Sequence, residues 1–318
     1  MVEHNYELPV SALLTYGDCL EIQKKYVNPE RDRLMKEVMA EGVESLTREK
    51  LATIPRFIQP DTWPNYVEEL GFTQAHVPAL VRMVTDDELN ELPGDDIAVW
   101  APVHAWRSLG FLRAEEAIEP LLGLLKDEYS DWVLDEVPWV LGMMGESAIS
   151  PVSLYLASRK HEEWSRSATI AALEHTAALY PALRETCVKK LSSQLADFRH
   201  NPDSLNGFLV SSLIELEAVG KANLIERAYA SGNVDESICG NWPNVKIDLG
   251  LATAEDFHPS ELESDFEWVK DEPPRIRAAK PVGLELPTKQ LKKKTSQVSG
   301  FGSGGGQAQK KKKKKKKR

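Results

Sequence analysis

The chain has 318 residues, of which 42% are apolar and 28% are charged, a composition typical of a folded protein with a substantial core. No stretch approaches the ~20 consecutive apolar residues of a membrane-spanning helix. The first residues also lack the basic and apolar segments of a secretory signal. We therefore expect a cytoplasmic protein without a membrane span. The three cysteines are too far apart in sequence to predict a disulfide framework or a structural zinc site.

Charge is divided unevenly along the chain. Residues 289–318 contain twelve lysines, one arginine and no acid, a charge of +13. Because the whole chain carries −10, residues 1–288 carry −23. A body of this charge repels phosphate backbones, whereas the tail attracts polyanions. The residues that we predict to bind nucleic acid, ribosomes or another polyanion are Lys310, Lys311, Lys312, Lys313, Lys314, Lys315, Lys316, Lys317 and Arg318.

The N-terminal residues 1–61 are predicted to form a helical segment of their own. Residues 30–48 within it are rich in Met, Leu, Glu, Lys and Ala, which favour helices. This segment does not clearly show the repeat that follows it, so we treat it as separate from the repeat region.

A short motif occurs twice in the next part of the chain. The first copy is Leu109-Gly110-Phe111 followed by Ala117-Ile118-Glu119-Pro120. The second copy is Leu141-Gly142-Met143 followed by Ala148-Ile149-Ser150-Pro151, and the two Ala-Ile-x-Pro elements lie 31 residues apart. A recurrence of this period is typical of a stacked two-helix unit. We therefore predict an all-α fold, an α-solenoid of the HEAT or armadillo type, over residues 62–232. Its helix pairs are expected at about 62–86, 95–127, 131–160, 163–198 and 203–232.

Apolar residues follow helical spacing through these pairs, and the alternating β-branched runs of strands are missing. Three stripes are predicted to face the core: Ile118, Leu121, Leu122 and Leu125; Val188, Leu191, Leu195 and Phe198; and Leu209, Leu213, Leu216 and Val219. Glycines that suit the left-handed turn closing a helix are Gly110, Gly142 or Gly145, and Gly220.

The repeat pattern is broken by Gly240-Asn241-Trp242-Pro243. We predict a C-terminal cap over residues 233–270, because an end repeat must present a polar outer face. From residue 271 onward proline pairs, and then glycine and serine, dominate the sequence. This is the composition of an extended, flexible linker. Residues 271–318 are therefore predicted to be a disordered linker and polylysine tail.

The Leu-Gly and Ala-Ile-x-Pro pattern resembles the HEAT-like repeats named after phycobiliprotein lyases, best at about 104–126 and 137–157. The core from Pro9 to about Leu251 is also similar to an uncharacterised bacterial family of helical-repeat proteins, through Val103-His104-Ala105-Trp106 and Gly240-Asn241-Trp242. These resemblances imply a curved stack of helix pairs with a concave recognition surface, and binding rather than chemistry. Some relatives of the first family act as paired subunits of phycobilin lyases or isomerases.

The residues of catalytic and metal sites form no recognisable motif in this sequence. None of the seven histidines belongs to a His-Glu-x-x-His arrangement or an i, i+4 histidine pair. The Gly-x-Ser-x-Gly nucleophile elbow is also missing. Paired carboxylates such as Asp86-Asp87 lie near expected helix starts, where they stabilise the helix dipole. We therefore predict no catalytic residue, no metal ligand and no cofactor.

Two helices carry aromatic residues that could pack or bind. In residues 131–144, the side chains expected to face the core are Val133, Val137, Val140 and Met144. The adjoining stripe, which we predict to pack on the next repeat, is Trp132, Trp139 and Met143.

The helix expected from residue 97 to residue 109 has an apolar arc on one side. Opposite this arc, at i, i+4 and i+7, lie Trp100, His104 and Arg107. An aromatic ring, an imidazole and a guanidinium on one exposed face are typical of a binding surface. A merely solvated face is the alternative. We predict that these three residues contact a protein partner.

The function predicted from these features is a non-catalytic protein-interaction scaffold or adaptor. A protein partner would bind the solenoid surface, and the basic tail would attach to a polyanion. The alternative is a phycobilin lyase-like enzyme subunit that acts on a chromophore-bearing protein, and uptake of bilin by the purified protein would distinguish it. A third hypothesis makes the lysine run a nuclear import signal, if the source is eukaryotic.

Overall fold

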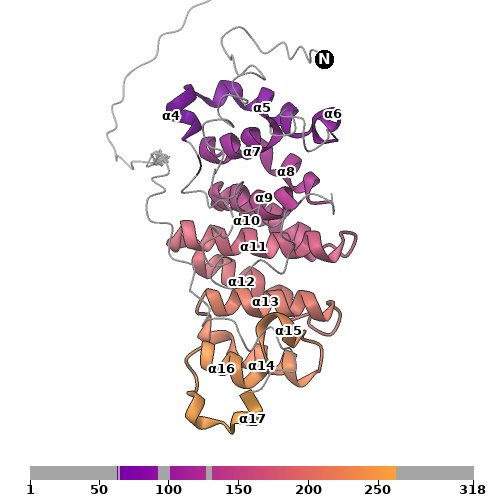
Figure 1. The fold of residues 1–318 in the computed structure, drawn as a ribbon, viewed down its shortest axis with the longest axis vertical. Helices are drawn as coiled ribbons and strands as arrows, with labels where there is room; N and C mark the ends of the chain where they lie inside the picture. Colours follow the sequence, from indigo (N-terminus) through magenta and orange to yellow (C-terminus); the bar gives the residue numbers. More distant parts are fainter. Residues whose placement is uncertain (1–62, 64, 92–100, 127–130, 263–318) are drawn as a thin grey trace, which may run out of the picture. The chain divides into compact units, whose positions relative to one another are not determined.

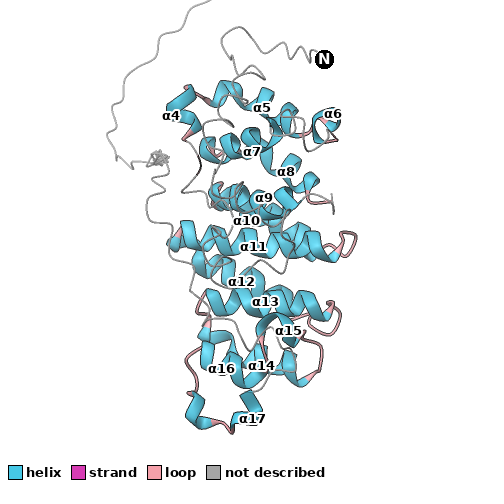
Figure 2. Cartoon of the chain, in the orientation of Figure 1, coloured by secondary structure: helices cyan, strands magenta, loops and turns pink. Residues whose placement is uncertain are grey.

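A computed structural model describes residues 63, 65–91, 101–126 and 131–262. These residues form helices and connecting loops, with no strand among them (Figure 2). The prediction of an all-helical fold is therefore confirmed for this part of the chain. The chain divides into two compact units, Met1–Glu285 and Leu286–Arg318, and every described residue belongs to the first. The predicted 1–61 segment and the 271–318 tail lie outside the described residues.

Most of the first helices of this unit are short. They are α4 (Tyr66–Leu70), α5 (Val77–Val84), α6 (Asp87–Asn90), α7 (Ala101–Leu112) and α8 (Ile118–Leu124). Side chains cap the starts of α4 and α6. Asn65 caps α4 by accepting a hydrogen bond from the Glu68 amide at 3.3 Å. Gly71 ends the same helix in the left-handed conformation, with φ of 68°. These two residue types are among those most favoured at helix starts and ends, respectively.

The central helices have between 9 and 17 residues each. They are α9 (Asp131–Met143), α10 (Glu146–Ala157), α11 (Glu163–Leu179), α12 (Arg184–Leu195), α13 (Asp203–Glu215) and α14 (Ala222–Ala230). The chain continues through α15 (Glu236–Cys239), α16 (Trp242–Asp248) and α17 (Pro259–Leu262). These last three short helices occupy the region in which the sequence predicts a cap.

The helices follow one another as the pairs α4–α5, α7–α8, α9–α10, α11–α12 and α13–α14. In four of these pairs a one-turn 3-10 helix comes immediately before the second helix. The four turns are η3 (Gln74–His76) before α5, η5 (Glu115–Ala117) before α8, η6 (Pro181–Leu183) before α12, and η7 (Val219–Lys221) before α14. The same local geometry therefore recurs in helix pairs that have little sequence in common.

Each helix packs on the equivalent helix of the neighbouring pair. The first helices follow one another, with α7 against α9, α9 against α11, α11 against α13, and α13 against α15. The second helices do the same, with α8 against α10, α10 against α12, and α12 against α14. Figure 1 shows this succession from α4 to α17.

The core lies between these two rows of helices and is formed by the predicted apolar stripes. Fully buried side chains include Trp106, Leu109, Leu121, Leu141, Leu173 and Leu191. The stripes that begin at Ile118, at Val188 and at Val133 are buried throughout, as predicted. In the stripe that begins at Leu209 the prediction is wrong for Val219, which is 44% exposed. Helix α13 ends at Glu215, so Val219 belongs to the following 3-10 turn instead.

The glycines of the repeated motif lie inside helices, at the points where helices cross. A Cβ added to Gly142 of α9 would lie 2.8 Å from the Cβ of His175 and 3.2 Å from the Thr176 amide nitrogen, both on α11. A Cβ on Gly110 of α7 would lie 2.9 Å from the Met143 sulfur of α9. The prediction that Gly110 closes its helix is therefore wrong. Of the alternatives Gly142 and Gly145, it is Gly145 that has a positive φ, 68°, although its ψ of −134° lies outside the αL conformation. Gly220 lies within η7 without a positive φ, so the prediction is also wrong there.

Candidate functional site

The structure buries two of the three residues that the sequence placed on an exposed binding face. His104 is 1% exposed and Arg107 is 5% exposed, so the prediction of an exposed stripe is wrong for both. The physical reason is that α7 is covered by α4 and α5 as well as by α9. A helix enclosed in this way has no free polar side. Trp100, the third residue of the predicted stripe, lies outside the described residues.

Arg107 forms a buried ion pair with Glu136 of α9. Its Nε donates to Glu136 Oε2 at 2.7 Å and its Nη2 donates to Oε1 at 2.5 Å. Trp106 Nε1 donates to the same carboxylate at 2.9 Å. The Arg107 guanidinium carbon also lies 5.1 Å from the centroid of the Trp63 ring. Desolvation acts to lower the pKa of Arg107, but the hydrogen bond and charge of Glu136, together with smaller effects of Tyr66, outweigh it, and the pKa lies above its usual value.

His104 completes this buried cluster through Tyr66 of α4. The Tyr66 hydroxyl lies 2.6 Å from His104 Nδ1. Burial, and then the positive charge of Arg107, lower the pKa of His104 to about 3. The imidazole is therefore neutral at physiological pH. We call Tyr66, His104, Trp106, Arg107 and Glu136 the Arg107 cluster; it joins α4, α7 and α9 inside the protein and offers little surface to a partner.

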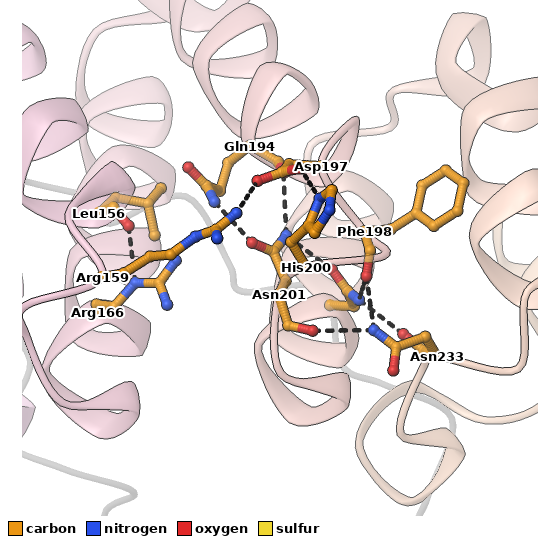
Figure 3. Close-up of polar contacts among 10 residues, drawn as sticks. Leu156, Arg159, Arg166, Gln194, Asp197, Phe198, His200, Asn201 and Asn233 are labelled. Atoms are coloured by element: carbon orange, nitrogen blue, oxygen red, sulfur yellow. Dashed lines mark hydrogen bonds and ion pairs between the residues drawn. The ribbon is translucent and has the colours of Figure 1, made fainter.

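A second polar cluster lies at the turns between the helix pairs, where three asparagines join two turns (Figure 3). The Asn206 amide donates to the carbonyl oxygens of Phe198 and Asn233, at 2.9 and 2.6 Å. The Asn233 amide donates to the carbonyl oxygens of Phe198 and Asn201, at 2.6 and 2.9 Å. Asn201 Nδ2 in turn donates to Asn206 Oδ1 at 2.9 Å. The turn after α12 is thereby tied to the turn after α14.

Charged side chains lie on the solvent side of these turns. Arg159, which follows α10, donates from Nη2 to Asp197 Oδ2 at 2.6 Å, and His200 Nδ1 lies 2.5 Å from Asp197 Oδ1 (Figure 3). The side chains of Arg159, Asp197 and His200 are 59%, 43% and 64% exposed. Hydrogen bonds from His200 and Arg159 hold the pKa of the Asp197 carboxyl below its usual value. These contacts link the turn after α10 to the turn after α12.

Arg166 of α11 lies beside Arg159 but is buried, at 4% exposure (Figure 3). Its Nε donates to the carbonyl oxygen of Leu156 at 2.8 Å. Its Nη2 is buried and makes no hydrogen bond. Burial, and then the charge of Arg159, lower the pKa of Arg166.

An aromatic pair stands next to Arg166. The rings of Tyr155 and His161 stack with centroids 3.6 Å apart and an angle of 3° between their planes. Burial, and then the charges of Arg166 and Lys160, lower the pKa of His161. We call Arg159, His161, Arg166, Asp197 and His200 the turn surface.

The turn surface was not predicted from the sequence, although two local signals of it are present. One is the basic run Arg159-Lys160-His161, and the other is the presence of asparagine in the turns at Asn201 and Asn233. Asparagine readily bonds to nearby backbone and so favours turns. What the sequence did not show is that turns about 40 residues apart along the chain meet at one place.

The predicted aromatic stripe of α9 packs on the next helix pair where the structure tests it. Trp139 stacks on His175 of α11, with ring centroids 3.5 Å apart, and Met143 is fully buried. Burial lowers the pKa of His175 to about 3. The prediction of packing on the next helix pair is thus confirmed for Trp139. Met143 is buried, and its sulfur lies next to Gly110 of α7 in the preceding pair.

Comparisons with protein-family models, curated proteins and solved structures find no match to this chain. The resemblance to HEAT-like repeats therefore stays a prediction. Among the described residues, no three His, Cys, Asp or Glu side chains gather as metal ligands. None of the helices in the described ranges combines the length and hydropathy needed to cross a bilayer. The predicted polyanion-binding residues 310–318 lie outside those ranges.

Proposed function

We propose that this protein is a non-catalytic interaction scaffold, an α-solenoid whose turn surface binds a protein partner. The observation that carries this proposal is the joining of successive turns by Asn201, Asn206 and Asn233. Because their hydrogen bonds hold neighbouring turns together, the charged side chains outside them are presented on a rigid support. A binding surface whose groups are held in place before association loses less conformational entropy when a partner binds.

Two observations support the solenoid arrangement within this proposal. Equivalent helices of successive pairs pack on each other, and a 3-10 turn recurs before the second helix in four pairs. Repetition of one unit with contacts to neighbours only is the defining property of a solenoid.

The residue types of the turn surface support binding. Arginine and aromatic side chains supply most of the energy of protein interfaces, and here Arg159 is exposed beside the stacked Tyr155 and His161. These groups lie on loops carried by packed helices, which is where binding residues concentrate in many folds.

The binding function is tested by capture of partners with matched variants of the full chain. Replacing both Arg159 and His200 by Ala should reduce capture of a specific partner at least ~10-fold, a loss typical of one interface anchor. The control is Arg227→Ala, which removes an exposed arginine from α14. Equal capture by the parent, the double variant and the control would rule out the turn surface as the binding site.

The solenoid arrangement is tested by deletion of whole helix pairs. Because each pair contacts only its neighbours, a chain lacking residues 163–288 should keep part of its helix content with reduced stability. Circular dichroism and thermal melting measure both quantities. Complete loss of helix in the shortened chain would indicate a single cooperative globule.

The remaining parts of the proposal concern residues outside the described ranges. The basic tail would attach the scaffold to a polyanion, and its charge of +13 supports this. A cytoplasmic location stays a prediction.

A further inference from the structure

Two arginines of this protein are buried to the same extent in different surroundings. Arg107 is 5% exposed and Arg166 is 4% exposed. Arg107 has a carboxylate partner that takes two of its donors. For Arg166 the structure shows one hydrogen bond, from Nε to the neutral carbonyl oxygen of Leu156 at 2.8 Å. Its Nη2 has no hydrogen-bond partner.

A buried guanidinium without a counter-charge is an unfavourable arrangement. Removal of a charge from water is costly, and the cost is recovered when an opposite charge and hydrogen bonds replace the water. Among the described residues no acid forms an ion pair with Arg166. The charges of Glu163 and Asp197 act on Arg166, but no hydrogen bond or ion pair joins either of these described acids to it. Asp197 already bonds Arg159 through one oxygen and His200 through the other.

Charged groups of both signs act on Arg166. Burial, and then the positive charge of Arg159, lower the pKa of Arg166. Burial, and then the charges of Arg166 and Lys160, in turn lower the pKa of His161. Glu163 and Asp197 act in the opposite direction on Arg166, but burial and Arg159 are larger effects. Arg159 thus places a second positive charge close to Arg166, and Glu163 and Asp197 offset part of the two charges.

We propose that Arg166 and Arg159 form a binding site for an oxyanion, either a carboxylate or a phosphate group. A planar guanidinium presents paired N–H donors that match the oxygens of both groups. The anion takes the place of Asp197 on the exposed Arg159 side chain, and a local rearrangement opens the covered Nη2 of Arg166 to the same anion. Arg159 and Arg166 then donate to the same anion.

This inference rests on the proposed function in one respect: the oxyanion would belong to an acidic or phosphorylated side chain of the protein partner. Binding of a small anion can be measured without any partner. Failure of the anion site is therefore distinguishable from failure of partner capture.

The experiment uses the full chain labelled with 15N-arginine. The Nε–Hε resonances are followed by NMR while inorganic phosphate or acetate replaces chloride at constant ionic strength. Variants Arg166→Lys and Arg159→Lys assign the two signals. Arg199, an exposed arginine in the same turn as Asp197, is the internal control. The lysine-rich tail is the same in every sample, so its own binding of phosphate cancels in the comparison.

The expected result is a saturating shift of the Arg166 and Arg159 resonances, with a midpoint at least ~10-fold lower in anion concentration than for Arg199. A response to phosphate alone identifies a phosphate site, and a response to both anions identifies a general oxyanion site. An Arg166 resonance that follows Arg199 in both titrations would overturn the proposal.

A second measurement keeps the proposal testable if a variant at the buried Arg166 does not fold. Anions that bind the folded state raise the melting temperature, so phosphate should stabilise the parent more than chloride does at equal ionic strength. Arg159→Gln changes an exposed side chain and should reduce this gain at least about twofold. Arg199→Gln should leave it unchanged. A gain of the same size in all three proteins would contradict the site.

Discussion

The ion pair between Arg107 and Glu136 is the main polar feature of the described core. One carboxylate accepts hydrogen bonds from Trp106 Nε1 and from Nε and Nη2 of Arg107. Breaking a buried pair by removal of one partner leaves the other charge uncompensated, which is far more costly than the net value of the pair. Such a pair therefore strongly favours the one packing of α7 on α9 in which both partners meet.

Replacing Glu136 by Ala should lower the free energy of unfolding by about 3–5 kcal/mol, because Arg107 stays buried without its counter-charge. Urea denaturation at pH 7 measures this change. The control is Glu185→Ala on α12, whose side chain is 82% exposed. This control should change stability by no more than about 0.5 kcal/mol. Equal effects of the two substitutions would show that the Arg107 cluster contributes no more than a surface residue.

Two histidines with lowered pKa values, the buried His104 and the partly buried His175, predict a loss of stability in mild acid. In the folded protein burial lowers the pKa of both His104 and His175 to about 3, whereas an unfolded chain has histidine pKa values near ~6.5. The unfolded state therefore binds more protons between these values. It follows that stability rises with pH through this window and that these groups add no further pH dependence above it.

Acidification from pH 7 to pH 5 should then lower the free energy of unfolding by about 2 kcal/mol for each of these two histidines. The measurement is the difference in unfolding free energy between the two pH values, by urea denaturation. In His104→Gln and in His175→Gln the difference should shrink by about 2 kcal/mol each, and by about twice that in the double variant. A difference that neither substitution changes would show that other groups cause the acid sensitivity.

At the scale of elements, helix crossings explain the glycine of the repeated motif. Successive first helices approach each other closely at Gly110 and Gly142, where a side chain would meet the neighbouring helix. The adjoining leucines, Leu109 and Leu141, are completely buried. In each Leu-Gly element the leucine thus packs in the core and the glycine allows the next helix to approach closely. These two roles account for the recurrence of the element in two consecutive helix pairs.

Gly142→Ala should destabilise the protein by about 1–3 kcal/mol, because the added methyl group overlaps the backbone of α11. The matched control is Gly123→Ala in α8, where a Cβ would meet no atom within 4 Å. Alanine favours helix over glycine, so this control should leave stability unchanged or raise it by up to about 1 kcal/mol. Thermal unfolding of both variants measures the contrast. Similar stabilities for the two variants would contradict the close crossing of α9 and α11.

At the scale of the whole molecule, charge separates the tail from the rest of the chain. If residues 310–318 contact phosphates, RNA affinity should fall with salt at a log–log slope of roughly −6 to −8. A chain that ends at residue 288, whose charge is −23, should not bind RNA. Fluorescence anisotropy measures the RNA affinity of the full chain and of the shortened chain. The salt concentration is kept above ~0.1 M, where attraction between tail and body is screened. Equal binding by the shortened chain would place an RNA site in the acidic body.

The extent of two helix pairs could be predicted closely from the sequence. The expected pair at 163–198 corresponds to α11 and α12, and the pair at 203–232 corresponds to α13 and α14. Apolar spacing within each helix, together with proline and glycine between helices, is a local signal that needs no knowledge of the neighbours. For the same reason the buried stripe from Val188 to Phe198 was predicted correctly.

Tertiary structure decided which polar side chains are buried and which are exposed. A helical wheel assigns His104 and Arg107 to a polar side, but that side meets solvent only if no other helix covers it. Here α4 and α9 cover it, and Tyr66 and Glu136, each about 30 to 40 residues away in sequence, supply the partners that make burial tolerable. Local spacing thus determined the helices and their apolar faces. Long-range packing determined which polar side chains became internal and which, such as Arg159 and His200, stayed on the surface.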